Sequence, residues 1–134
     1  MADRYMKQFL ATLEAGVAKL YGEVTTTTSG TIGSTSCKGF TVAKTAGEAG
    51  RYTVTLADKY NKLLHCGVVV VGSADAAYTS AKGLVAFLRN DTVASGGKTF
   101  DVQFCDTDGS PADAELEDAA KFKLEITLKN SSAY

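Results

Sequence analysis

The sequence predicts a mainly β protein: an antiparallel β-sandwich or jelly-roll-like domain with an N-terminal helical or arm segment. Several short segments alternate apolar and polar residues with the period of two that a half-buried strand requires. Stretches rich in Gly, Ser, Asp or Pro separate them, at a spacing typical of sandwiches and barrels and not of βαβ units. The length of 134 residues suits a single domain. Residues 1–17 are its predicted arm or helix, and residues 18–134 its sandwich.

The N-terminal segment carries an apolar stripe at helical spacing behind Asp3, a candidate N-cap. Leaving such a stripe in water costs about 25 cal/mol per Å² of apolar area, so this domain or a partner must cover it. We expect either a helix that closes one end of the sandwich or an arm that reaches another protein. Its basic side chains would add a charge-dependent contact at the rim. The predicted partner-binding residues are Arg4, Met6, Lys7, Phe9, Leu10 and Leu13.

Three strands are predicted in the first half of the chain. Residues 18–26 and 38–44 are two of them, and Gly22 predicts a bend or a bulge in the first. Residues 51–56 alternate without a slip, and from Asp58 the spacing changes to that of one helical turn, which Asp58 would cap. The apolar residues of this third strand and of the turn are Tyr52, Val54, Leu56, Tyr60, Leu63 and Leu64.

Four more strands are predicted in the second half. The run "HCGVVVVG" at residues 65–72 is continuously β-branched, which predicts a central strand covered on both sides. Residues 84–91 form another strand, and strict alternation predicts strands within residues 98–106 and 121–129. The core residues expected in these last two are Phe100, Val102, Phe104, Phe122, Leu124, Ile126 and Leu128. The predicted loops are residues 28–36, 45–50, 94–98 and 106–115.

Composition excludes several classes of protein. Hydrophobic residues make up 45% and charged residues 22% of the chain, as in ordinary globular proteins, and no apolar run is long enough to span a bilayer. The first residues mix charges throughout and lack the apolar region of a secretory signal. Residues 1–67 carry eight basic and five acidic side chains (+3), and residues 68–134 carry six and ten (−4). Because the lysines are scattered, we expect neither nucleic acid nor a membrane as a partner.

The three cysteines, Cys37, Cys66 and Cys105, lie far apart in the sequence and form no C-x-x-C pair. This odd, dispersed set predicts reduced structural thiols in a reducing compartment, and neither a disulfide framework nor a thiolate zinc site. Strand parity places Cys105 on the face opposite Phe104, so we expect Cys105 to be the most accessible of the three.

No pattern in the sequence predicts an active site. His65 is the only histidine, and its neighbour Cys66 should point to the opposite face of the same strand. The acidic segment at residues 106–118 invites a calcium interpretation, but counting from Asp106 puts Gly109 at loop position four, where an EF-hand requires glycine at position six. Phosphate-binding glycine motifs are missing as well. We therefore expect no enzyme, no catalytic residue, no cofactor and no metal.

Three segments carry a resemblance to a known class of protein. The chain opens with "KQFLATLEAGVAKLYGEV", continues with "GRYTVTLADKYNKLL" after a Gly/Ala turn, and ends with "DAELEDAAKFKLEITLKNSS". In this order they resemble small virion proteins of tailed bacteriophages, of the capsid decoration or cement type. The resemblance implies a β-sandwich or jelly-roll-like protein, made in the host cytoplasm, that binds the major capsid protein on the capsid surface and stabilises the shell. It also implies a homo-oligomer, a dimer or a trimer.

Two other functions have the same sequence features. A tail or baseplate subunit of such a virion would have this composition, and would bind tail tubes or fibres in place of heads. A carbohydrate-binding β-sandwich module would use aromatic side chains, of which the chain has six Tyr and six Phe, as stacking platforms for sugars.

Overall fold

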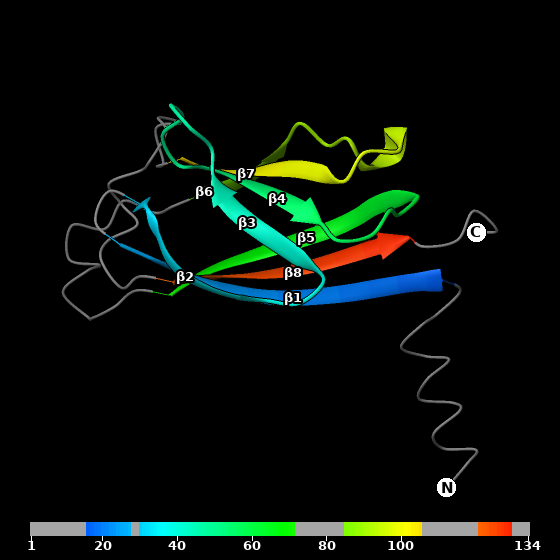
Figure 1. Ribbon diagram of the computed structural model, residues 1–134, viewed down its shortest axis with the longest axis horizontal. Helices are drawn as coiled ribbons and strands as arrows, with labels where there is room; N and C mark the ends of the chain where they lie inside the picture. The colour runs from blue at the N-terminus through cyan, green and yellow to red at the C-terminus, as the bar shows by residue number, and fades with distance from the viewer. Residues whose placement is uncertain (1–15, 28–29, 72–84, 106–120, 130–134) are drawn as a thin grey trace, which may run out of the picture.

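The computed structural model describes residues 16–27, 30–71, 85–105 and 121–129, which form two antiparallel four-stranded sheets (Figure 1). The strands are β1 (Val17–Thr26), β2 (Ile32–Cys37), β3 (Phe40–Lys44), β4 (Arg51–Leu56), β5 (Lys62–Val71), β6 (Val85–Arg89), β7 (Thr99–Cys105) and β8 (Lys121–Lys129). Sheet A has the order β2-β1-β8-β5 and sheet B the order β3-β4-β7-β6. The sheets lie face to face around one core, so the predicted antiparallel sandwich is confirmed.

The edges of the two sheets are arranged in pairs. β2 contacts β3, so these two edge strands lie on the same side of the sandwich. By the strand orders, β5 and β6 are then the edge strands on the other side. The short turn at Lys38 and Gly39 joins β2 to β3, whereas residues 72–84, between β5 and β6, lie outside the described residues.

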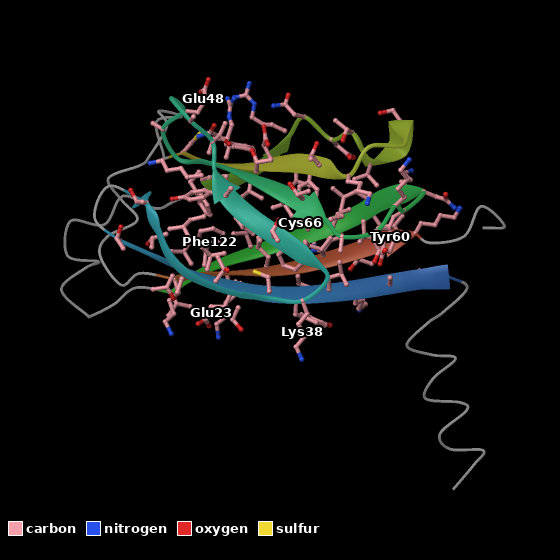
Figure 2. All side chains as sticks on the ribbon, viewed as in Figure 1. Glu23, Lys38, Glu48, Tyr60, Cys66 and Phe122 are labelled. Carbon is pink, nitrogen blue, oxygen red and sulfur yellow. The ribbon has the colours of Figure 1, made fainter. Side chains whose placement is uncertain are left out.

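Alternating side chains of β4, β7 and β8 fill the space between the sheets, as the sequence predicts. The predicted core residues of these strands are all buried: Tyr52, Val54, Leu56, Phe100, Val102, Phe104, Phe122, Leu124, Ile126 and Leu128. At the centre, Phe122 of sheet A packs against two aromatic rings of sheet B. Its ring centroid lies 5.0 Å from that of Tyr52 and 5.2 Å from that of Phe104. Figure 2 shows Phe122 between the two layers.

Gly22 creates space in β1, and the prediction of a bulge at this residue is wrong, whereas the predicted bend stays a prediction. The pairing of β1 with β8 runs without a shift through Gly22 and Leu124. A Cβ atom on Gly22 would lie 2.5 Å from Cζ of Phe40 and 2.6 Å from Sγ of Cys37. The glycine is therefore required by the close approach of these two side chains. The irregularity of β1 lies instead between Thr25 and Thr26, where its pairing with β2 shifts.

The loop predicted at residues 28–36 is wrong in its second part, because β2 begins at Ile32. Its residues, Gly, Ser and Thr, have the composition of a loop. They form a strand because β1 pairs with them from Gly22 to Thr26 and satisfies their backbone groups. As an edge strand, β2 leaves its middle residues exposed and needs few apolar side chains.

The helical turn predicted after Asp58 does not form. The residues between β4 and β5 cross from sheet B to sheet A through bends and irregular backbone. The N–H of Ala57 donates to the carbonyl of Gly39 (2.9 Å), and the N–H of Asn61 donates to the carbonyl of Lys129 (2.8 Å). The spacing of Leu63 and Leu64 has a different cause. A bulge between Leu63 and His65 shifts the register of β5 on β8, so Leu63 is buried and Leu64 exposed.

The prediction that β5 is a central strand is also wrong. β5 is the edge strand of sheet A and pairs only with β8 among the described strands. Val68 and Val70 pack against the core, whereas Val69 and Val71 face outward and are 61% and 39% exposed. An uninterrupted β-branched run predicts burial on both faces only if something covers the outer face, and the described residues leave this face open.

The connection from β6 to β7 is a compact, hydrogen-bonded loop, as predicted for residues 94–98. It contains one turn of 3₁₀-helix, η4 (Val93–Ser95), and Gly96 ends this turn in the left-handed conformation (φ 87°). The hydroxyl of Thr92 donates to the carbonyl of Thr99 (2.8 Å) and accepts from its N–H (3.1 Å). These bonds place the ends of β6 and β7 firmly relative to each other.

Candidate interaction surface

The six predicted partner-binding residues lie outside the described residues, within the segment 1–15. They are Arg4, Met6, Lys7, Phe9, Leu10 and Leu13. Val17, the next apolar residue of the predicted stripe, begins β1 and pairs with Lys129. The acidic segment 106–118 also lies outside the described residues. The partner-binding role of the N-terminal segment stays a prediction.

His65 and Cys66 point to opposite faces of β5, as predicted. His65 is exposed on the outer face of sheet A, and Cys66 packs against the core between the two layers (Figure 2). Burial raises the pKa of the Cys66 thiol to about 11, which keeps this thiol protonated at neutral pH. The two side chains therefore cannot act as a nucleophile and its base. Across the four described segments, no group of three His, Cys, Asp or Glu side chains could hold a metal ion.

The described part of the chain contains no helix that is long and apolar enough to cross a membrane.

The expectation that Cys105 is the most accessible cysteine is wrong. All three cysteines are free, but Cys105 is buried while Cys37 and Cys66 are partly exposed. Strand parity does place Cys105 on the outer face of sheet B, next to Asp101 and Gln103. That face of β7 is covered, so parity alone did not predict exposure.

Cys37 is therefore expected to react first with a thiol reagent. Burial raises the pKa of both thiols, that of Cys66 to about 11, so Cys66 holds very little of the reactive thiolate at pH 8. Peptide mapping after timed alkylation of the native protein measures the order. Faster labelling of Cys66 or Cys105 than of Cys37 would contradict this assignment.

A buried polar network holds the outer face of sheet B together. Both carboxylate oxygens of Asp101 in β7 accept hydrogen bonds, one from the hydroxyl of Thr53 (2.9 Å) and one from the amide of Asn90 (2.7 Å). Gln103 accepts a bond from Nε of Arg51 (3.0 Å) and donates to the carbonyl of Ala49 (2.8 Å). The network joins β4, β7 and the end of β6, and it rigidifies the sheet because its buried groups have partners.

Asn90 shows how the sequence builds this network. It follows β6 directly and is the only non-glycine residue with a positive φ (51°) among those described. Asparagine adopts this left-handed conformation more readily than most residues. The resulting turn aims the Asn90 amide at Asp101, so β6 is anchored to β7 at this end.

β6 presents apolar side chains that the described residues do not cover. Val85 and Phe87 face outward opposite Cys105 and Gln103, and are 44% and 51% exposed. Leu88 faces the other way, opposite Val102, and is still 42% exposed. We call Val85, Phe87 and Leu88 the β6 surface. Exposed apolar clusters of this kind on a rigid element are typical of protein–protein interaction sites.

A second apolar strip follows the outer face of β5 and consists of Gly67, Val69 and Val71. The charged side chains of β8 beside this strip form ion pairs with β1. In the strand order, β1 and β5 lie on opposite sides of β8. Glu23 of β1 binds Lys121 (3.2 Å) and Lys123 (3.7 Å), the residues opposite Val71 and Val69. Lys19 of β1 binds Glu125, opposite Gly67, at 4.0 Å. Figure 2 shows Glu23 on this outer face.

Both apolar surfaces were visible in the sequence as apolar runs that lack the alternation of apolar and polar residues. The runs "GVVVV" and "LVAFL" were correctly predicted as strands, but their lack of alternation was interpreted as burial for the first. In an edge strand the same lack of alternation means that one face is apolar and exposed. Telling the two apart requires the strand order, which depends on pairings between residues far apart in the sequence.

No protein family, no curated protein and no solved structure matches this chain.

Proposed function

We propose that the protein is a structural virion protein that binds the outside of a tailed-phage head and stabilises the capsid shell. The resemblance of its three segments to capsid decoration proteins supports the proposal, and the sandwich fold that the resemblance implies is the fold observed. The observation that carries it is the β6 surface, three exposed apolar side chains on a strand whose end is anchored by the hydrogen bond from Asn90 to the buried Asp101. A binding protein needs such a surface, whereas a catalyst needs convergent reactive groups.

The β6 surface suits attachment to a large, regular assembly. Its three apolar side chains project from both faces of one edge strand, so a partner can pack on them while pairing with the strand itself. Arg89 follows them at the end of β6 and is exposed, which adds a charged rim. An apolar centre with a polar rim is the usual organisation of an interface.

The N-terminal stripe is proposed as a second attachment site on the same shell. Two weak contacts made by one copy act together, because the first raises the effective concentration of the second to the millimolar range for short connections. A modest interface then becomes long-lived on a shell that presents many identical sites. Many such clamps would resist the expansion of the head under internal pressure.

Co-sedimentation with purified heads that lack this protein tests the proposal. We expect saturable binding to heads, and roughly tenfold or greater weakening by Phe87→Ser, which removes the largest apolar side chain of the β6 surface. Tyr21→Ser is the matched control, because Tyr21 is an aromatic residue on the outer face of sheet A that is 60% exposed, against 51% for Phe87. Lack of binding to heads by the unaltered protein would refute the proposal, and equal losses in both variants would remove the β6 surface from it.

The N-terminal site is tested in the same assay by the double variant Phe9→Ser, Leu10→Ser in the full-length protein. We expect weaker binding to heads with the urea midpoint of unfolding unchanged, as for an arm. A lower midpoint instead would identify the segment as part of the protein's own core, and the attachment role would then belong to the β6 surface alone.

The other candidate functions have less support. Binding to tail tubes in preference to heads would assign the protein to the tail or baseplate, and the same assay distinguishes them. A carbohydrate-binding module needs free hydrogen-bonding groups beside an exposed aromatic ring. Phe87 is such a ring, but the amide of Gln103 opposite it is committed to Arg51 and Ala49 of its own chain.

A further inference from the structure

We propose that the β5 edge binds the β5 edge of a second copy of this chain, in antiparallel pairing about a two-fold axis at Val68. This pairing would join two copies of sheet A into one continuous eight-stranded sheet. The proposed attachment to heads uses the β6 surface of the other sheet, and β6 lies at the same side of the sandwich as the β5 edge.

Among the residues that the structure describes, no strand pairs with the outer edge of the second half of β5. Proteins usually protect edge strands with charged residues, proline or a bulge, because unpaired backbone groups pair readily with another strand. The bulge of β5 lies at Leu63–His65, and from His65 to Val71 its register on β8 is regular. Cys66 to Val71 contain no charge and no proline. An edge of this kind is expected to have a partner strand.

The charged side chains of sheet A do not oppose the pairing of two β5 edges. In the paired dimer, β8 of one copy and β8 of the other are three strand spacings apart, about 14 Å, which exceeds the Debye length of about 8 Å at physiological salt. Glu23 also holds Lys121 and Lys123 toward β1, away from the edge. Two identical edges can therefore approach without like-charge repulsion.

The side chains of two β5 edges fit each other when the strands pair about Val68. Residues 65–71, the regular part of β5, are centred on Val68, so a two-fold axis there gives each of them a partner. Gly67 then lies opposite Val69 of the second copy on the outer face, and the most exposed valine meets the residue without a side chain. On the inner face, Cys66 lies opposite Val70 of the second copy, and both already pack against the core. At the axis, Val68 lies opposite Val68 of the second copy, and a cross-strand pair of β-branched side chains stabilises antiparallel strands.

Other edges of the sandwich are less suited to self-pairing. β2 and β3 lie beside each other on the opposite side of the sandwich. β6 is half as long as β5 and ends in Arg89, and two-fold pairing along it would bring the arginines of both copies into the interface. The occupant that best matches an uncharged, symmetric valine edge is therefore the same edge of another copy.

The mass of the full-length protein in solution, measured by light scattering over a concentration series, tests the pairing. We expect a dimer, and a dissociation constant raised roughly tenfold or more by Val69→Lys, which puts a charge into the centre of each edge. Thr41→Lys is the matched control, because Thr41 is an exposed β-branched residue on the outer face of β3, the edge strand on the opposite side of the sandwich. It should leave the dimer unchanged.

Several results would overturn the proposal. These are a monomer at every concentration, a trimer, or a dimer weakened by Thr41→Lys and not by Val69→Lys. A monomer in solution whose Val69→Lys variant loses binding to heads would assign the β5 edge to a capsid strand. Because Phe87→Ser reports on heads and Val69→Lys on self-association, failure of this pairing and failure of the proposed function are distinguishable.

Disulfide cross-linking tests the register. Val68→Cys places two cysteines opposite each other at the two-fold axis, where facing Cα atoms lie about 4.5–5.5 Å apart, within reach of a disulfide. We expect mild oxidation to give a covalent dimer of this variant. The unaltered protein should stay uncross-linked, because Cys66 then faces Val70 of the second copy. A covalent dimer through Val69→Cys and not through Val68→Cys would contradict the pairing about Val68.

Discussion

Replacing Phe122 by alanine is expected to lower the free energy of unfolding by about 3–5 kcal/mol, which is a large part of the 5–15 kcal/mol typical of a domain. Phe122 is fully buried, and its ring contacts the rings of Tyr52 and Phe104 across the interface of the two sheets. Its removal leaves a cavity where sheet A meets sheet B, and Tyr52 and Phe104 each lose one ring contact while keeping the contact with each other (ring centroids 5.7 Å apart). Urea unfolding followed by circular dichroism measures the change.

Phe87→Ala is the matched control, because it deletes the same atoms from a side chain that is half exposed. We expect it to cost roughly 1 kcal/mol or less. We expect a clear difference in the free energy of unfolding between Phe122→Ala and Phe87→Ala. Similar costs for Phe122→Ala and Phe87→Ala would mean that the sheets do not pack around the aromatic cluster described here.

Replacing Gly22 by alanine is expected to destabilise the protein by about 1–3 kcal/mol, because an added methyl group overpacks this position. The added Cβ would lie 2.5 Å from Cζ of Phe40 and 2.6 Å from Sγ of Cys37, so both side chains must move. Because β1 pairs regularly through Gly22 on both sides, the strand cannot shift to make room. The measurement is again the free energy of unfolding in urea.

Two further variants separate this steric effect from the general effect of alanine in a strand. Gly67→Ala has its nearest neighbour at 3.3 Å and is expected to change stability by about 0.5 kcal/mol or less. Phe40→Leu shortens the side chain that the new Cβ meets, so adding it to Gly22→Ala should cost less than the sum of the two single changes. Additive costs would show that Gly22 and Phe40 are not in contact.

Sequence patterns predicted the strands of this protein better than their positions in the sheets. The alternation at Phe122, Leu124 and Ile126 has one physical cause, burial of one face, so it predicts both the strand and its orientation. The Gly- and Ser-rich β2 was missed because its stability comes from pairing with β1 and not from its own side chains. Local composition carries no information about such a partner.

The same limit applies to the candidate interaction surface. The valines of β5 and the apolar residues of β6 were visible in the sequence, but whether they are central or at an edge depends on strand order. The network around Asp101 could not be predicted, because its partners Thr53 and Asn90 come from two other parts of the chain. The predicted N-terminal site rests on helical spacing and on the resemblance to decoration proteins, and the described residues begin after it.

The central claim, that the protein stabilises a phage head, is tested most directly by the temperature at which DNA-filled heads release their DNA. Heads lacking the protein would be heated with and without a saturating amount of it, and release followed with a DNA-binding dye. We expect heads with the protein to release their DNA at a higher temperature than heads without it. The Phe87→Ser variant at equal concentration should raise the release temperature less. A release temperature that stays unchanged while the protein is bound to the heads would contradict the claim.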